Sequence, residues 1–295
     1  MTFHVHGGDA LKRRSTSGQV TSGAVVSTSG RIRPSDTFVL RGRESNFVEQ
    51  DAHLERRARP PREGPNTVGG VTKLVVWDFD ETLAERPGRW WGCLLEIIER
   101  RHPDCEADEQ ALRAALRGLY PWHSPEVVHE HLNDPDDWWA ALQPGLAAAA
   151  VAAGLDPLDA DAVAAEVRSC FATTEAFRLY DDTTDALRMF RDAGWRQTIV
   201  SNHCPELESL VDGLGIGVFF DKVYSSACTG YEKPHPRAIG LALEYFEVDM
   251  AWMIGNSAKS DIGAADAVGI PSVLVVRDRP APLVAAATLV LRGAG

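Results

Sequence analysis

The stretch Leu74-Val75-Val76-Trp77-Asp78-Phe79-Asp80-Glu81-Thr82 places an unbroken apolar run directly before two aspartates that are two positions apart. An apolar run without alternation is typical of a strand that is buried on both faces of a parallel sheet. In open parallel sheets ligands bind beyond the carboxyl ends of the strands, so the residues after such a run are candidates for chemistry. The period of two in an extended chain brings Asp78 and Asp80 toward a common side.

Similar apolar runs recur later in the chain, and segments with helical spacing lie between them. The runs are Thr198-Ile199-Val200, Trp252-Met253-Ile254 and Val273-Leu274-Val275-Val276, with a further candidate strand at Lys222-Val223-Tyr224. Apolar residues recur every three to four positions over 207–214 and 239–246, as in helices that bury one face. Alternating strands and helices predict an α/β fold with a doubly wound parallel sheet.

Residues 84–180 interrupt this alternation, because they contain four helical patterns and no convincing strand. The patterns cover 90–101, 109–119, 136–152 and 160–171. Such an insertion between the first and second core strands predicts an all-helical cap domain beside an α/β core of residues 71–83 and 181–295. Five tryptophans fall in the insertion, and most of them are expected to form its core.

The first 70 residues differ in composition from the rest of the chain. They are rich in Ser, Thr, Gly, Arg and Pro and carry 11 basic and 7 acidic side chains. Apolar residues there are mostly single, so little buried surface is available to offset the entropy of ordering. Residues 1–70 are therefore expected to form a disordered N-terminal extension.

Composition also excludes several classes of partner. The 295 residues include 42 acidic and 30 basic side chains, and a net charge of -12 repels a nucleic-acid backbone. No stretch approaches the roughly 18 to 20 consecutive apolar residues of a membrane helix. Five cysteines without paired metal-ligand spacing argue against a disulfide framework or a zinc site. We expect a cytoplasmic monomer or homodimer with no nucleic-acid or membrane partner.

The residues at the other strand ends favour phosphate chemistry. Two carboxylates as close as Asp78 and Asp80 push one pKa up, which leaves one group ionised to attack and the other able to carry a proton. Hydroxyl, amide and ammonium groups that can hold a phosphoryl group follow the later strands at Ser201, Asn202 and Lys233. The segment Gly255-Asn256-Ser257-Ala258-Lys259-Ser260-Asp261 adds oxygen ligands suited to Mg²⁺.

With these four motifs in this order, the sequence resembles the haloacid dehalogenase-like (HAD) hydrolase superfamily over roughly residues 73–276. The resemblance implies that Asp78 is a nucleophile that forms an aspartyl-phosphate and that Asp80 is the acid/base. It implies that Thr82, Ser201 and Lys233 hold the phosphoryl group of a small phosphate ester. It further implies that Mg²⁺ is held by Asp78, by the backbone carbonyl of Asp80, and by Asn256 or Asp261.

Two residues depart from the pattern of the superfamily. Glu81 stands where glycine is commoner, and Asn256 stands where an aspartate is usual, so a neutral amide occupies the expected metal position. A phosphoglycolate-like or sugar-phosphate substrate is our hypothesis from family analogy. A phosphomutase, a dehalogenase and a non-catalytic phosphate-binding domain remain open as alternatives.

Overall fold

The computed structural model describes residues 24–27, 71–278 and 280–293. Most of the extension that was expected to be disordered therefore lies outside the described residues. Within it, β1 (Ala24–Ser27) is a strand that pairs antiparallel with β8 (Ser272–Val275), so the expectation of disorder is wrong for this segment. Its Ala-Val-Val-Ser sequence pairs with backbone groups that the edge of the parallel sheet leaves free.

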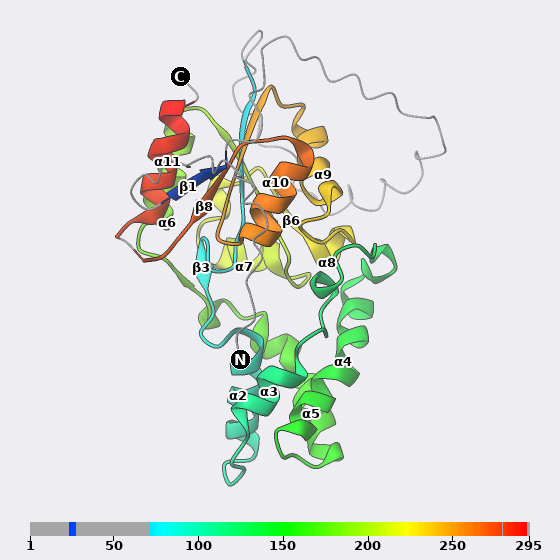
Figure 1. The fold of residues 1–295 in the computed structure, drawn as a ribbon. Helices are drawn as coiled ribbons and strands as arrows, with labels where there is room; N and C mark the ends of the chain where they lie inside the picture. Colours follow the sequence, from blue (N-terminus) through cyan, green and yellow to red (C-terminus); the bar gives the residue numbers. More distant parts are fainter. Residues whose placement is uncertain (1–23, 28–70, 279, 294–295) are drawn as a thin grey trace, which may run out of the picture.

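A six-stranded sheet forms the centre of the core, in the order β1-β8-β7-β2-β5-β6 (Figure 1). The apolar run of residues 74–77 lies in the central strand β2 (Lys73–Trp77). The strands β5 (Arg196–Ser201) and β7 (Met250–Gly255) lie on either side of β2, and β6 (Lys222–Ser225) and β8 lie beyond them. All four run parallel to β2, as predicted. Their carboxyl ends therefore meet at one edge of the sheet.

Helices cover both faces of the sheet, and β2 shows why. Val75 and Trp77 pack into a core with α6 (Thr183–Asp192), α7 (Leu207–Gly213) and α11 (Pro282–Gly293). Leu74 and Val76 point to the opposite face, where α9 (Pro236–Phe246) and α10 (Gly263–Val268) lie. Side chains alternate along a strand, so a strand that is apolar at every position has to be buried on both sides. The doubly wound α/β prediction is confirmed.

The inserted cap contains four helices near their expected positions: α2 (Arg89–Arg101), α3 (Glu109–Ala115), α4 (Pro135–Ala152) and α5 (Pro157–Phe171). Helix α3 ends four residues earlier than predicted, because the chain turns at Gly118, whose φ of 81° is left-handed. The 3₁₀ turns η1 (Pro121–His123), η2 (Glu130–Leu132) and η3 (Thr174–Ala176) connect the helices and lead back to the core.

The cap is not entirely helical. The chain enters it through β3 (Ala84–Glu85) and leaves it through β4 (Arg178–Leu179), and these two strands pair antiparallel. The prediction that residues 84–180 hold no strand is therefore wrong in this detail, since two-residue strands carry too little pattern to be recognised. The paired strands tie the two connections between cap and core to each other.

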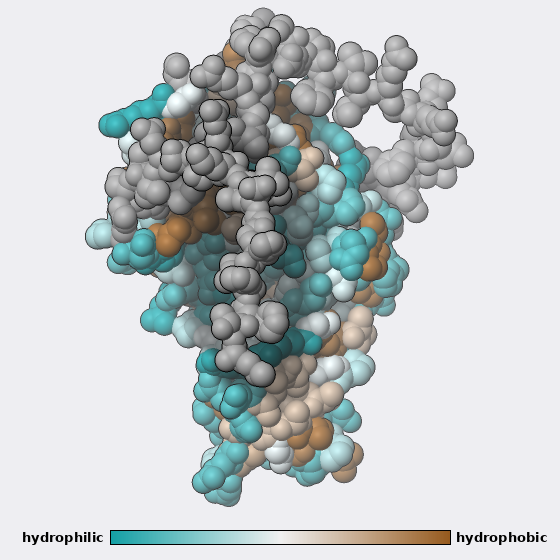
Figure 2. Space-filling model, in the orientation of Figure 1, coloured by the Kyte–Doolittle hydropathy of each residue, from teal (hydrophilic) through white to brown (hydrophobic). Residues whose placement is uncertain are grey.

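The surface of the cap around α4 and α5 carries pale brown, weakly apolar residues beside teal ones (Figure 2). This follows from the alanine-rich sequence of α4 and from the exposure of Val151 and Leu158 near the ends of the two helices.

In the part of the chain that the structure describes, no helix combines the length and the apolar character that crossing a membrane requires.

Candidate active site

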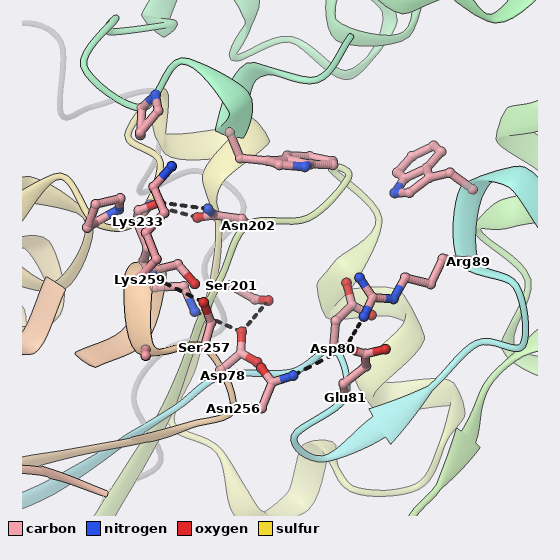
Figure 3. A pocket seen from close by; sticks show the side chains of 16 residues that line it. Asp78, Asp80, Glu81, Arg89, Ser201, Asn202, Lys233, Asn256, Ser257 and Lys259 are labelled. Atoms are coloured by element: carbon pink, nitrogen blue, oxygen red, sulfur yellow. Dashed lines mark hydrogen bonds and ion pairs between the residues drawn. The ribbon is translucent and has the colours of Figure 1, made fainter. Parts of the chain in front are cut away.

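Asp78 follows β2 directly, and its carboxylate is held by three donors, of which Lys233 and Ser201 are drawn in Figure 3. Oδ1 accepts hydrogen bonds from Lys233 Nζ at 2.7 Å and from Ser201 Oγ at 3.0 Å. Oδ2 accepts one from Thr82 Oγ1 at 2.8 Å. These residues come from three different strand ends, as the sequence predicted. The carboxylate is thereby fixed in one orientation at the floor of a cavity.

Thr82 was expected to contact a phosphoryl group, but it lies behind Asp78 instead. It is completely buried and does not line the cavity. After β2 the chain makes a tight turn in which the carbonyl of Phe79 accepts from the amides of Leu83 and Ala84. This turn directs the Thr82 hydroxyl at Asp78 Oδ2, so Thr82 orients the predicted nucleophile.

Lys233 lies between two carboxylates and is almost completely buried. Its ammonium is 2.7 Å from Asp78 Oδ1 and 2.6 Å from Asp261 Oδ1. Burial alone lowers the pKa of Lys233, but the charges of Asp261 and Asp78 outweigh burial and raise it. The lysine therefore stays charged and neutralises part of the acidic floor.

Asp261, which was predicted as a possible metal ligand, does not line the cavity. Its Oδ1 pairs with Lys233, and its Oδ2 accepts from the Ser257 amide at 2.8 Å. The carboxylate also packs so tightly on Gly255 that a Cβ at that position would lie 2.3 Å from Oδ2. Asp261 thus positions Lys233.

Asn202 lines the cavity, but both ends of its side chain are occupied. Its amide donates to the carbonyl of Lys233 at 2.9 Å, and its oxygen accepts from the amide of Lys233 at 2.7 Å. This paired contact holds the Lys233 loop beside β5, and the second N–H of the amide is still available for the predicted contact with phosphate.

Asp80 is the second predicted catalytic residue, and about a third of its side chain (34%) is exposed. Burial raises the pKa of its carboxyl, His203 opposes that shift, and the charge of Asp78 adds to it. The ring nitrogen Nε2 of the buried His203 lies 3.8 Å from Asp80 Oδ2. An aspartate with a raised pKa that lines the same cavity as Asp78 is suited to carrying a proton.

Asn256 and Glu81, the two departures from the family pattern, contact each other. Asn256 Nδ2 donates to Glu81 Oε2 at 3.2 Å, and Arg89 from the start of α2 also pairs with Glu81. Glu81 has a φ of 58°, which is unfavourable for a residue with a Cβ by about 1 kcal/mol. Arg277 donates to the carbonyls of Glu81 and Thr82, and so holds this turn from the β8 side.

The site contains oxygen ligands for a divalent cation, but few of them are carboxylates. Among residues 71–278 and 280–293, no three His, Cys, Asp or Glu side chains gather in a metal-binding cluster. Asp78, Asp80 and Asn256 nevertheless line one cavity and offer hard oxygen donors. Mg²⁺ takes few protein ligands and keeps waters or substrate oxygens in its other positions, so this donor set fits it.

The cavity lies between core and cap and has a volume of about 570 Å³. Trp90, Trp122 and Pro125 line it from the cap, whereas Trp138 and Trp139 are buried in the cap core as expected. Sequence reasoning assigned no role to Arg89 or Lys259, which also line it. Lys259 belongs to the quoted motif after β7, but nothing in its spacing indicates that it faces the cap.

Two groups of hydrogen bonds join the cap to the core. At η2 the His129 amide donates to the carbonyl of Gly230 at 2.9 Å, and the Tyr231 hydroxyl donates to Glu130 at 2.7 Å. At the start of α7, Glu206 accepts from Trp139 and Arg168 of the cap. The first group lies two to three residues before Lys233, so it connects the position of the cap to the catalytic loop.

Gly230→Ala is expected to disturb the contact between Gly230 and the cap at η2 and to lower kcat/KM by about tenfold. The reason is that closure of a cap over an active site excludes water and completes the site. A Cβ at Gly230 would lie 2.6 Å from the backbone nitrogen of Glu130. Gly215→Ala is the matched control, since Gly215 has nearly the same left-handed φ (75° against 76°) but nothing within 4 Å. Steady-state kinetics that fall equally in both variants would contradict a role for the cap contact.

Glu232, next to Lys233, is buried, and neither of its carboxylate oxygens has a hydrogen-bond partner among the described residues. Burial raises its pKa from 4.5 to about 7, although Ser226 and Lys233 act against the shift. Because the folded protein holds this proton more tightly, the contribution of Glu232 to stability is complete below pH 4.5 and is lost as the pH rises through 7.

Glu232→Gln is therefore expected to increase the free energy of unfolding at pH 8 by roughly 3 kcal/mol and to change it little at pH 4. Urea unfolding between these pH values measures the difference. Glu99→Gln, at an exposed position of α2, provides the control. A difference between wild type and Glu232→Gln that does not vary with pH would show that the carboxyl does not titrate in this range.

Comparisons with known proteins agree with this fold. The family profile of haloacid dehalogenase-like hydrolases matches residues 72–269. Human haloacid dehalogenase-like hydrolase domain-containing protein 3 is 29% identical over 209 residues, which cover 69% of this chain and 82% of the human protein. A phosphoglycolate phosphatase of Colwellia psychrerythraea is 35% identical over 98 residues, which cover 32% of this chain and 43% of that enzyme.

A 2-haloacid dehalogenase from Pseudomonas syringae has a similar fold. Its structure matches with a TM-score of 0.53 at 18% identity, over 76% of this chain and all of that one. The family match spans β2, the whole cap and the strand ends that hold Asp78, Ser201, Lys233 and Asn256. The chain therefore belongs to the haloacid dehalogenase-like hydrolases.

Proposed function

We propose that this hydrolase is a Mg²⁺-dependent phosphatase that cleaves a small phosphate monoester through an aspartyl-phosphate on Asp78. The observation that carries the proposal is the Asp78 carboxylate, which Lys233, Ser201 and Thr82 hold in place in the cavity that Asp80, whose pKa is raised, also lines. Partial relatives named as phosphatases support the same activity. Phosphoryl transfer of this kind requires a nucleophile, an acid/base and a positive charge held near the phosphoryl group, and Lys233 provides that charge here.

The first step forms a bond between an Asp78 oxygen and phosphorus and breaks the bond from phosphorus to the leaving oxygen. Asp80 donates its proton to that oxygen, which leaves as an alcohol. In the second step Asp80 takes a proton from water as the water attacks phosphorus, and this releases phosphate and restores Asp78. Lys233 offsets negative charge throughout, since it is held next to Asp78.

Asp78, the Asp80 carbonyl and Asn256 are the groups that would hold Mg²⁺. The cation shields the attacking carboxylate from the negative phosphate and stabilises the charge that develops on the phosphoryl oxygens. Asn256 supplies a neutral oxygen here, and the nearby Glu81 carboxylate is paired with Arg89. We therefore expect a weak cation site.

Asn256→Asp is expected to tighten Mg²⁺ binding by about tenfold, because a carboxylate adds charge to the ligand set. Isothermal titration of Mg²⁺ into the protein without substrate measures the change independently of activity. Asn133→Asp makes the same chemical change in the cap and provides the control. Unchanged affinity in Asn256→Asp would exclude residue 256 from the cation site.

Hydrolysis of a carbon–halogen bond is the second candidate, and Asn256 favours it, because that reaction needs the nucleophile but no metal. Asp80 argues against it, since no general acid is required there. A panel of phosphate esters, including sugar phosphates, and 2-haloacids, assayed for phosphate, halide and isomerised sugar phosphate with and without Mg²⁺, tests the proposal. Mg²⁺-dependent phosphate release supports the phosphatase. Halide release, isomerised sugar phosphates or no turnover would favour a dehalogenase, a mutase or a binding domain, respectively.

A further inference from the structure

Three cationic side chains line the cavity, and two of them are neutralised by acids that they contact. Lys233 lies between Asp78 and Asp261, and Arg89 pairs with Glu81. Lys259 is different, because its side chain is exposed and no hydrogen bond or ion pair joins its ammonium to the residues described in 71–278 and 280–293. The cavity therefore has one cation whose charge is not compensated by a contacting carboxylate.

The backbone of Lys259 is held firmly beside the catalytic floor. It lies in η5 (Ala258–Ile262), directly after Asn256 and Ser257. The Ser257 hydroxyl caps this turn by accepting from the Ser260 amide at 3.1 Å. In Figure 3 Lys259 lies on one side of Asp78, whereas Arg89 and Glu81 lie on the other. The uncompensated charge is thus on the side of the cavity away from Glu81.

The ammonium of Lys259 is also near the cap. His123 follows Trp122 in η1, and its pKa is lowered by burial and, secondly, by the charge of Lys259. Trp122 and Pro125 line the cavity from the same segment of the cap. Lys259 therefore lies between the floor, where a phosphoryl group would meet Asp78, and the cap loop that covers it.

A substrate whose phosphoryl group is at Asp78 and whose alcohol part extends toward the cap brings that part between Trp122 and Lys259, which line the same cavity. An anion on that part meets Glu81 and Asp80 on one side and the free ammonium of Lys259 on the other. Because Lys259 is exposed, its contact with such an anion is a charge-assisted hydrogen bond that salt weakens.

We propose that Lys259 binds a second anionic group on the leaving alcohol, so that the preferred substrates are phosphate monoesters that carry a carboxylate or a second phosphate. The proposal rests on the phosphatase function proposed above. Lys259 acts here as a specificity residue, because it touches the part of the substrate that does not react.

The test compares esters that differ in one group: 3-phosphoglycerate, which has a carboxylate, and glycerol 3-phosphate, which has an alcohol at that position. Lys259→Gln is expected to lower kcat/KM for 3-phosphoglycerate by about tenfold, mainly through KM, and to change that for glycerol 3-phosphate less than about twofold. Lys259→Arg should retain most of the preference, and Lys259→Glu should reverse it. Propane-1,3-diol bisphosphate, set against its monophosphate, distinguishes a phosphate from a carboxylate as the second anion.

Lys73→Gln is the matched control, since Lys73 lies at the opposite end of β2, against Trp195. Equal losses for both esters in Lys259→Gln, or no loss for either, would overturn the proposal. Equilibrium binding of the two esters to the Asp78→Asn protein tests the anion-binding role of Lys259 separately from the phosphatase function. If neither ester is turned over by wild type but Lys259→Gln still weakens 3-phosphoglycerate binding about tenfold, the phosphatase function fails while the anion site stands.

Discussion

Asp78→Asn is expected to lower phosphatase turnover by at least about 10⁴-fold while leaving the fold intact. The amide has the shape of the carboxylate but is a poor nucleophile, so the bond to phosphorus does not form. Lys233 keeps Asp261 as its partner in this variant, which limits the loss of stability. Steady-state assay of the best ester from the panel measures the loss of turnover, and thermal unfolding measures the effect on the fold.

Asp192→Asn, at an exposed position near the end of α6, is the matched control and should keep wild-type activity. Activity that survives in Asp78→Asn would remove Asp78 as the nucleophile. Turnover in H₂¹⁸O then separates the two hydrolytic mechanisms. Water that attacks phosphorus labels the released phosphate, whereas water that attacks the carbonyl carbon of an Asp78 ester, as in dehalogenation, labels the side chain of Asp78.

The arrangement of strand ends could be predicted from the sequence because it depends on few rules. Apolar runs such as 74–77 identify buried parallel strands, and parallel strands bring their carboxyl ends to one edge. The meeting of Asp78, Ser201 and Lys233 follows from that topology alone. The sequence therefore indicates which residues gather, although they are up to 155 positions apart.

The roles of individual polar groups could not be predicted in the same way. Thr82, Asn202 and Asp261 were all expected to face a ligand, yet each forms hydrogen bonds within the protein. A buried polar group has to be satisfied, and which partner satisfies it depends on distances of a few tenths of an ångström that spacing does not encode. These side chains orient Asp78 and Lys233, and so they contribute to the site indirectly.

The sequence does not distinguish the cap tryptophans that line the cavity from those that form the cap core. Trp90 and Trp122 line the cavity, whereas Trp138 and Trp139 do not, and all four belong to helical patterns or turns of similar composition. Their roles depend on how the cap packs on the core through contacts such as that of Glu206 with Arg168. The spacing of apolar residues within the cap, or within the core, does not show how the cap and the core pack on each other.

Lys233→Met is expected to destabilise the fold by roughly 3–5 kcal/mol and to reduce turnover by about 10²- to 10³-fold. Methionine has nearly the volume of lysine, so packing changes little, but the variant leaves the buried carboxylates of Asp78 and Asp261 without their cation. Burial and Asp78 raise the pKa of Asp261 to about 6 even against the opposing charge of Lys233. Without that charge the folded protein holds the proton still more tightly, so the loss of stability is largest above the further raised pKa of Asp261 in the variant and shrinks as the pH falls to about 6 and below.

A double-mutant cycle distinguishes this electrostatic effect from a loss of packing. Asp261→Asn removes one of the two stranded carboxylates, so Lys233→Met/Asp261→Asn should be more stable than Lys233→Met alone at pH 8, and the two should converge at low pH. Lys73→Met makes the same change at a lysine outside the site and should cost little. Urea unfolding across this pH range measures every member of the cycle. If the effects of Lys233→Met and Asp261→Asn on the free energy of unfolding were additive and independent of pH, Lys233 would only fill space. Its ion pairs with Asp78 and Asp261 would then not stabilise the fold.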